Sequence, residues 1–74
     1  MIVKDLEFES IKYQRVETAD CIELIIIEKN IRGALIIDKK LKEIRTLGQI
    51  LEECDLENLC LLLEVARKEI KKLK

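Results

Sequence analysis

The second half of the chain carries apolar residues at alternating spacings of three and four positions, which places them on one face of an α-helix. One such series ends at Leu51, and another begins at Leu56. The spacing of five between these two residues breaks the pattern, so it predicts a reversal of the chain at Cys54-Asp55. The sequence therefore predicts an α-helical hairpin over residues 38–73.

An acidic residue precedes each of the two predicted helices. Asp38 stands before the first helix, predicted at 39–53, and Asp55 stands before the second, predicted at 56–72. A carboxylate at this position accepts hydrogen bonds from the first backbone N–H groups, which have no partner within the helix. Both aspartates are therefore predicted to be N-terminal caps.

The first half of the chain shows no clean helical face and fits β-strands better. The run from Cys21 to Glu28 is rich in isoleucine at odd and even positions, which is typical of a central strand covered on both sides. Residues 34–37 form a shorter run of the same kind. Asn30 and Gly33, which lie between the two runs, indicate the loop of a β-hairpin.

Two shorter strands are predicted upstream, at about 2–8 and 11–17. Between them the apolar positions change parity at Glu9-Ser10, as they do at a turn or a bulge. A competing interpretation places a helix between Thr18 and Gly33 in this half of the chain.

The predicted fold class is therefore α+β: a small antiparallel sheet over residues 2–37, followed by the helical hairpin over 38–73. All 74 residues, 1–74, are assigned to a single domain, because a chain of this length supports one core. The alternative is an all-α arrangement of three helices.

The composition indicates a compact chain. Charged residues make up 39% of it, with 14 basic and 15 acidic side chains, whereas disordered chains combine low hydrophobicity with a large net charge. No apolar run reaches the length that spans a membrane. An acidic residue stands at position 5, where a signal peptide would be basic and then apolar. We therefore expect an intracellular, cytoplasmic protein that does not contact a membrane.

The cysteines do not indicate a metal site. Cys21, Cys54 and Cys60 form no CxxC motif, and the chain has no histidine, so a zinc site is not expected. We expect all three to be small buried apolar groups. A redox pair between Cys54 and Cys60 is the alternative.

The charges of the two predicted helices run in opposite directions along the sequence. In an antiparallel hairpin, basic residues would gather at its open end and acidic residues at its tip. Acidic residues of the strands such as Glu17, the acidic tip of a second subunit, or a bound polyanion could compensate the basic end; a solvated surface is the simplest alternative. The basic residues considered for anion contact are Lys39, Lys40, Lys42, Arg45, Lys68, Lys71 and Lys72, and the acidic tip comprises Glu52, Glu53, Asp55 and Glu57.

Three residues suggest a contact between subunits. Leu61 and Val65 lie on the side of the second predicted helix that is opposite its main apolar stripe, which predicts an outward-facing seam for a homodimer; a slightly wider core is the alternative. Gly48 lies on the stripe of the first predicted helix, where glycine costs about 1 kcal/mol relative to alanine. Close approach of another backbone would explain this glycine, and chance is the alternative.

Catalytic motifs are missing from the sequence. Without histidine there is no imidazole-based dyad or triad, and two distant glycines cannot form a phosphate-binding loop. We therefore expect no enzyme activity, no cofactor and no metal. The sequence favours a small intracellular, non-catalytic protein-interaction module (an adaptor, an inhibitor or a regulatory subunit) that forms a homodimer through its C-terminal helices and has a possible protein partner. The alternative is a nucleic-acid-binding regulator that uses the basic residues named above.

Overall fold

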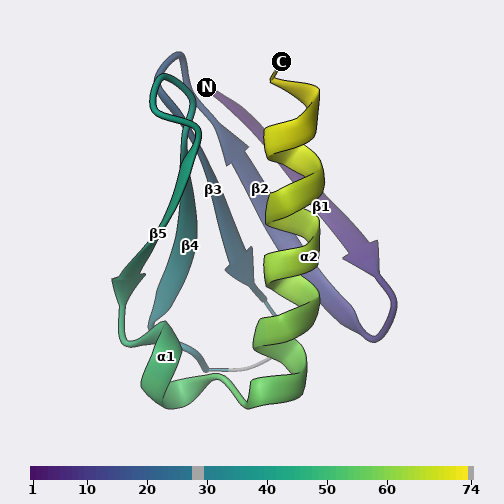
Figure 1. Ribbon diagram of the computed structural model, residues 1–74. Coiled ribbons are helices and arrows are strands. Elements are labelled where there is room, and N and C mark those ends of the chain that lie inside the picture. Colours follow the sequence, from purple (N-terminus) through teal and green to yellow (C-terminus); the bar gives the residue numbers. More distant parts are fainter. Residues whose placement is uncertain (28–29, 74) are drawn as a thin grey trace.

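The structure is a computed structural model that describes residues 1–27 and 30–73. It consists of one antiparallel β-sheet with helices on one side (Figure 1). The strands lie in the sheet in the order in which they occur along the chain, so each hairpin joins neighbours. The strands are β1 (Ile2–Phe8), β2 (Ile11–Glu17), β3 (Cys21–Ile26), β4 (Gly33–Asp38) and β5 (Glu43–Gly48), and the helices are α1 (Ile50–Glu53) and α2 (Leu56–Lys72).

The core lies between the sheet and α2. Alternate residues of β3 are buried, because successive side chains of a strand point to opposite faces and only one face meets the helix. From α2, a wide arc of side chains packs against these strand residues. The largest fully buried side chains are Ile22, Leu24, Leu35, Ile37, Ile50 and Leu62.

Four predicted strands and one predicted helix are confirmed. The predictions at 2–8 and 11–17 match β1 and β2, and the isoleucine-rich runs form β3 and β4, paired antiparallel. The predicted helix at 56–72 is α2, and its cap is confirmed, since Asp55 Oδ1 accepts a hydrogen bond from Asn58 N at 2.8 Å. Glu28, the predicted end of the third strand, and part of the hairpin loop lie outside the described residues.

The prediction of a helical hairpin is wrong, and so is the alternative prediction of three helices. Instead of a helix at 39–53, the chain forms a turn, the edge strand β5 and the single-turn helix α1. Lys42 adopts a φ of 56° and Gly48 a φ of 70°, and such left-handed residues cannot continue an α-helix. A helix between Thr18 and Gly33 is also excluded, because this segment contains the strand β3.

Asp38 caps a turn and not a helix. Its Oδ1 accepts hydrogen bonds from Lys40 N at 3.0 Å and Leu41 N at 2.9 Å, within the loop that joins β4 to β5. These hydrogen bonds lower the pKa of the Asp38 carboxyl, the bond from Leu41 most of all. The chemistry that suggested an N-cap is therefore present, but it closes a β-hairpin.

The close backbone approach predicted at Gly48 is confirmed, although the element is a strand. Gly48 lies opposite Gly33 in the pairing of β5 with β4. A Cβ at Gly48 would lie 2.8 Å from Arg32 O and 3.0 Å from the Gly33 Cα. A side chain at this position would therefore collide with the neighbouring strand.

The prediction that β3 is covered on both sides is also wrong. Ile22, Leu24 and Ile26 point toward α2 and are buried, whereas Cys21 and Ile25 point away from it and are half-buried. No described helix lies over this second face of the sheet.

The chain reverses direction near Cys54, as the hairpin prediction required. β5 runs toward α1, and after Cys54 and Asp55 the helix α2 runs back toward the opposite end of the molecule (Figure 1). As a result, the β4–β5 turn and the end of α2 lie at the same end of the molecule. No helix in residues 1–27 or 30–73 is long and apolar enough to span a membrane.

Candidate functional site

A group of four charged side chains joins the sheet to α2. Arg15 on β2 donates to Glu69 on α2 through Nε at 2.9 Å and through a terminal nitrogen at 3.1 Å. Arg15 also donates to Glu17 at 2.7 Å, and Lys39 Nζ lies 2.7 Å from the other oxygen of Glu17. We call Arg15, Glu17, Lys39 and Glu69 the inter-layer ion network.

The electrostatics of the inter-layer ion network favour its charged form. The hydrogen bond from Lys39, followed by the one from Arg15, lowers the pKa of Glu17 to about 2. The hydrogen bonds that Arg15 donates to Glu69 are the main cause that raises the pKa of Arg15. Burial, assisted by the charge of Glu69, raises the pKa of the Tyr13 hydroxyl. Every member of the network therefore has an opposite charge beside it, so we assign it a structural role and not an acid–base role.

The residues of the predicted dimer seam do not form one outward-facing surface: Gly48 is exposed on β5, whereas on α2 Leu61 is half-buried and Val65 is buried. Val65 is 5% exposed and belongs to the core, and Leu61 packs against the core from its edge. The sheet is broad, so it covers both flanks of the main apolar stripe of α2. Gly48 lies in β5, well separated in the fold from Val65. The outward orientation of the leucine and the valine is therefore a wrong prediction.

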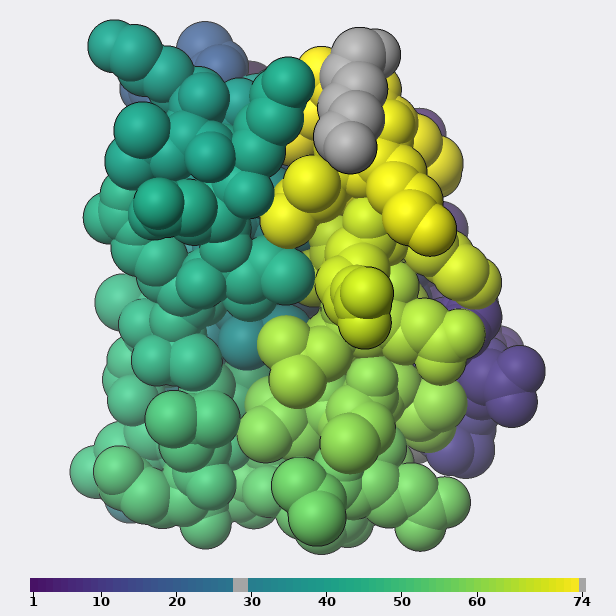
Figure 2. Space-filling view, in the orientation of Figure 1, coloured from purple at the N-terminus to yellow at the C-terminus, as the bar shows by residue number. Residues whose placement is uncertain are grey.

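The seven basic residues come from two parts of the fold. Lys39, Lys40 and Lys42 lie in the β4–β5 turn, and Arg45 lies on β5. The others lie on the last turns of α2, at the same end of the molecule (Figures 1 and 2). The structure thus brings most of the cluster to one end, although the hairpin from which it was inferred does not exist.

Acidic side chains neutralise part of this cluster of seven basic residues. Glu17 is one of them, as the sequence suggested. Lys39 is bound to Glu17, and Arg45 donates to Asp38 at 2.8 Å. The Lys68 ammonium lies 4.4 Å from the centre of the Phe8 ring. Among the seven basic residues, four exposed ones form neither an ion pair nor a ring contact with a described residue: Lys40, Lys42, Lys71 and Lys72. These four residues are referred to as the basic end.

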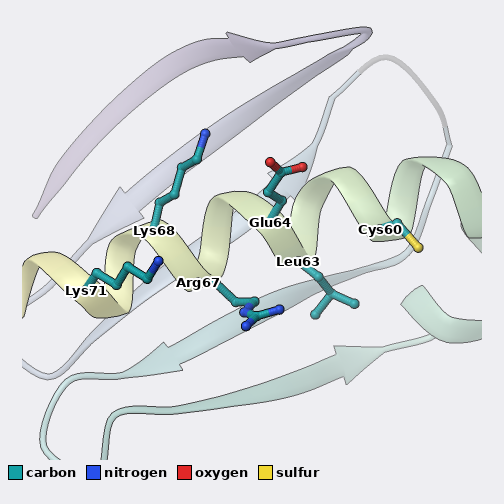
Figure 3. Close-up of a pocket in the computed structure, with 6 residues that line it drawn as sticks. All are labelled: Cys60, Leu63, Glu64, Arg67, Lys68 and Lys71. Carbon is teal, nitrogen blue, oxygen red and sulfur yellow. The ribbon is translucent and has the colours of Figure 1, made fainter.

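The outer ridge of α2 borders a shallow hollow of about 480 Å³ (Figure 3). Glu64 and Lys68 point toward one side of the sheet, whereas Leu63 and Arg67 point toward the other. Cys60 is exposed at one end of this ridge, so the prediction of three buried cysteines is wrong for this residue. No disulfide joins any of the three cysteines, and Cys54 is buried while Cys60 is exposed. Within residues 1–27 and 30–73, no cluster of potential metal ligands is present.

The second face of the sheet is the largest feature that the sequence analysis missed. In an antiparallel pair, residues directly opposite each other share a face. One cross-strand row on this face therefore runs Val3, Val16, Glu23, Ile36 and Arg45 from β1 to β5. The next row adds Ile25 on β3 and Ala34 and Leu47 on β4 and β5. We call this surface the uncovered face.

The uncovered face has an aliphatic centre and a charged border. Val3 is 50% exposed and Leu47 is 48% exposed, and Val16, Ile25 and Ile36 are half-buried between them. Its carboxylates are Asp5, Glu7, Glu23, Asp38 and Glu43, and its cations are Lys12 and Arg45. The face therefore combines an apolar strip with polar and charged neighbours, and exposed apolar patches with a polar rim mark interaction sites.

The charges of the inter-layer ion network neutralise one another, and the hollow on α2 is lined by the Cys60 thiol, Leu63 and four charged side chains. One signal could have revealed the uncovered face from the sequence: the isoleucines of β3 at positions of both parities. Comparison with protein-family models finds no match, and no curated protein or solved structure is significantly similar to this chain.

Proposed function

We propose that the protein is a small intracellular, non-catalytic protein-interaction module and that its contact surface is the uncovered face of the sheet. One observation supports this proposal most strongly: α2 buries the central part of one face of a five-stranded sheet, and aliphatic side chains such as Val3 and Leu47 are accessible on the other face. Antiparallel sheets that face water usually alternate apolar and polar residues, with the polar residues outward. Here Val16, Ile25 and Ile36 occupy the outward positions.

The alternative surface, α2, is less suited to this role. Apart from Leu56, its leucines and Val65 already belong to the core or pack against it. Its outer ridge is dominated by charged residues, such as Glu64, Arg67 and Lys71, which serve solubility on most exposed helices. Self-association through the C-terminal helices is therefore replaced, in this proposal, by contact through the sheet.

Site-specific photo-crosslinking tests the proposal in cells that make the protein. The photoreactive residue p-benzoylphenylalanine is placed at position 47, on the uncovered face, or at position 56 as a control. Leu56 is a matched control because it is 74% exposed and belongs to the helical layer. Crosslinked adducts at position 47 that are missing at position 56 are expected. Equal adducts at both positions, or adducts at position 56 alone, would contradict the proposal.

A second candidate function is contact with a polyanion, such as a nucleic acid, through the basic end. The observation in its favour is that Lys40 and Lys42 from a turn and Lys71 and Lys72 from α2 lie at the same end of the molecule. Phosphate contacts of this kind do not depend on sequence and weaken with salt. The net charge of −1 for the whole chain argues against it, so we rank it second.

An electrophoretic shift assay at low salt tests the second candidate. Retardation of a nucleic acid that is lost in the variant Lys71→Gln/Lys72→Gln would support it, with Lys12→Gln on the uncovered face as the control. If no nucleic acid is retarded by the unmodified protein, this candidate is excluded.

A further inference from the structure

We propose that the occupant of the uncovered face is a second copy of this chain, packed sheet against sheet over β3, β4 and β5. This inference rests on the proposed function and specifies its partner. It starts from three residues in one cross-strand row: Glu23 lies opposite Ile36, and Ile36 lies opposite Arg45. An isoleucine is thus flanked by a carboxylate on one side and a guanidinium on the other.

A two-fold axis that runs parallel to the strands beside Ile36 makes this row complementary to itself. The rotation places Ile36 of one copy over Ile36 of the other, and β3 of one copy over β5 of the other. Glu23 then faces Arg45 of the second copy, and the contact occurs twice, as an isologous interface requires. Any sheet stacked on this face lies about 10 Å away, a distance that long charged side chains can bridge.

The neighbouring row supports the same axis. β3 and β5 run in the same direction, because each is antiparallel to β4. Ile25 is two residues beyond Glu23, and Leu47 is two residues beyond Arg45, so the rotation also brings Ile25 against Leu47 of the second copy. Aliphatic residues thus meet aliphatic residues, and opposite charges meet beside them.

The Glu23 carboxylate needs a partner of opposite charge if a second sheet covers it. Glu23 is half-buried in the middle of the apolar strip and forms no hydrogen bond or ion pair with a described residue. Covering it with a purely apolar surface would bury an uncompensated carboxylate, at a large energetic cost. Arg45 already donates to Asp38, and its guanidinium has further N–H donors for a second carboxylate.

The overlap of the two copies is limited to three strands of six residues each. At about 4.8 Å between strands and about 3.4 Å per residue, these strands span on the order of 300 Å² of each copy. A standard interface buries about 800 Å² of each partner, so this contact belongs to the small, weak class of interfaces.

Sedimentation equilibrium with charge-reversal variants tests the proposal. The unmodified protein is expected to form a dimer. Glu23→Arg and Arg45→Glu should each weaken it by about thirtyfold or more, because each places like charges in contact. The double variant Glu23→Arg/Arg45→Glu should restore the dimer, since it exchanges the two charges. Circular dichroism of each variant verifies the fold, and Leu47→Asp, an exposed position, provides an independent disruption.

Three results would overturn the inference: a protein that stays monomeric, single variants that dimerise normally, or a double variant as weak as the single ones. The failure of this inference is distinguishable from failure of the proposed function. A monomeric protein that still crosslinks from position 47 to a different protein retains the uncovered face as a contact surface but loses the second copy as its occupant.

Discussion

Arg15 on β2 and Glu69 on α2 form a two-pronged ion pair between residues that are 54 positions apart in the sequence. The Glu69 side chain is 9% exposed and the Arg15 side chain is 16% exposed, so the pair is largely removed from water. Arginine and carboxylate match each other in such a geometry, which fixes orientation as well as distance. The pair therefore sets how the last turns of α2 lie on the sheet.

Removal of the carboxylate from this pair should destabilise the protein. Breaking a buried ion pair leaves a charge without its partner and typically costs about 3–5 kcal/mol; because Arg15 keeps Glu17, we expect about 2–4 kcal/mol for Glu69→Ala. Glu64→Ala, which truncates an exposed glutamate of the same helix, should change the free energy of unfolding by less than about 0.5 kcal/mol. Urea denaturation measures both values. Equal effects would show that Glu69 does not join the two layers.

The pKa of Glu17 predicts how stability depends on pH. It lies at about 2 in the folded chain, below the value of about 4.3 for an unperturbed glutamate. A lowered pKa in the folded state contributes stability above the unfolded value, and this stability is lost as the pH falls from about 4.3 toward 2. Unfolding free energies of the unmodified protein should therefore decrease in this window, and those of Glu17→Gln should decrease less. Glu64→Gln is the control, and an identical pH profile for Glu17→Gln would refute the assignment.

Gly48 should tolerate no side chain. Its φ of 70° disfavours other residues, and a Cβ would lie 2.8 Å from Arg32 O. We expect Gly48→Ala to lower the free energy of unfolding by about 1–3 kcal/mol. Thr46→Ala, at an exposed position of the same strand, should have little effect when measured by the same denaturation. A neutral Gly48→Ala would mean that the β4–β5 contact is looser than described.

Truncating a leucine of α2 to alanine should lower the free energy of unfolding by an amount that depends on the face of the helix it occupies. Leu62 is fully buried, and its truncation to alanine should cost about 2–5 kcal/mol. Leu56→Ala should be nearly neutral, because Leu56 is 74% exposed at the start of the helix. Thermal or urea denaturation compares the two variants. Similar losses of unfolding free energy in the two variants would contradict the orientation of α2 on the sheet.

The sequence was informative where local chemistry and tertiary packing agree. α2 has a capping aspartate, an apolar stripe and basic residues in its last turn, and the structure places it as predicted. The strands β1 to β4 show β-branched runs and turn signals. For β5 the local signals were misleading: as an edge strand it buries almost nothing, so no alternation of buried positions reveals it. The glycine that ends it was noticed, but the left-handed backbone of Lys42 left no trace in the sequence.

The contact surface was misplaced for a related reason. Once a second long helix was assumed, Val65 was left outside the expected core. With only one long helix, the sheet covers both flanks of α2, and the unmatched apolar residues are those of β3 and its neighbours. Which face of a sheet remains uncovered depends on the number of helices, and this cannot be read from any single segment.

The most direct test of the central claim is a residue-resolved NMR comparison of dilute and concentrated protein. If the uncovered face is the contact surface, the amide and methyl signals of Val16, Ile25, Ile36 and Leu47 shift with concentration. The amide signals of Cys60 and Glu64, on the outer ridge of α2, do not shift. Shifts confined to α2, or spectra that are unchanged at every concentration, would contradict the self-contact of this face.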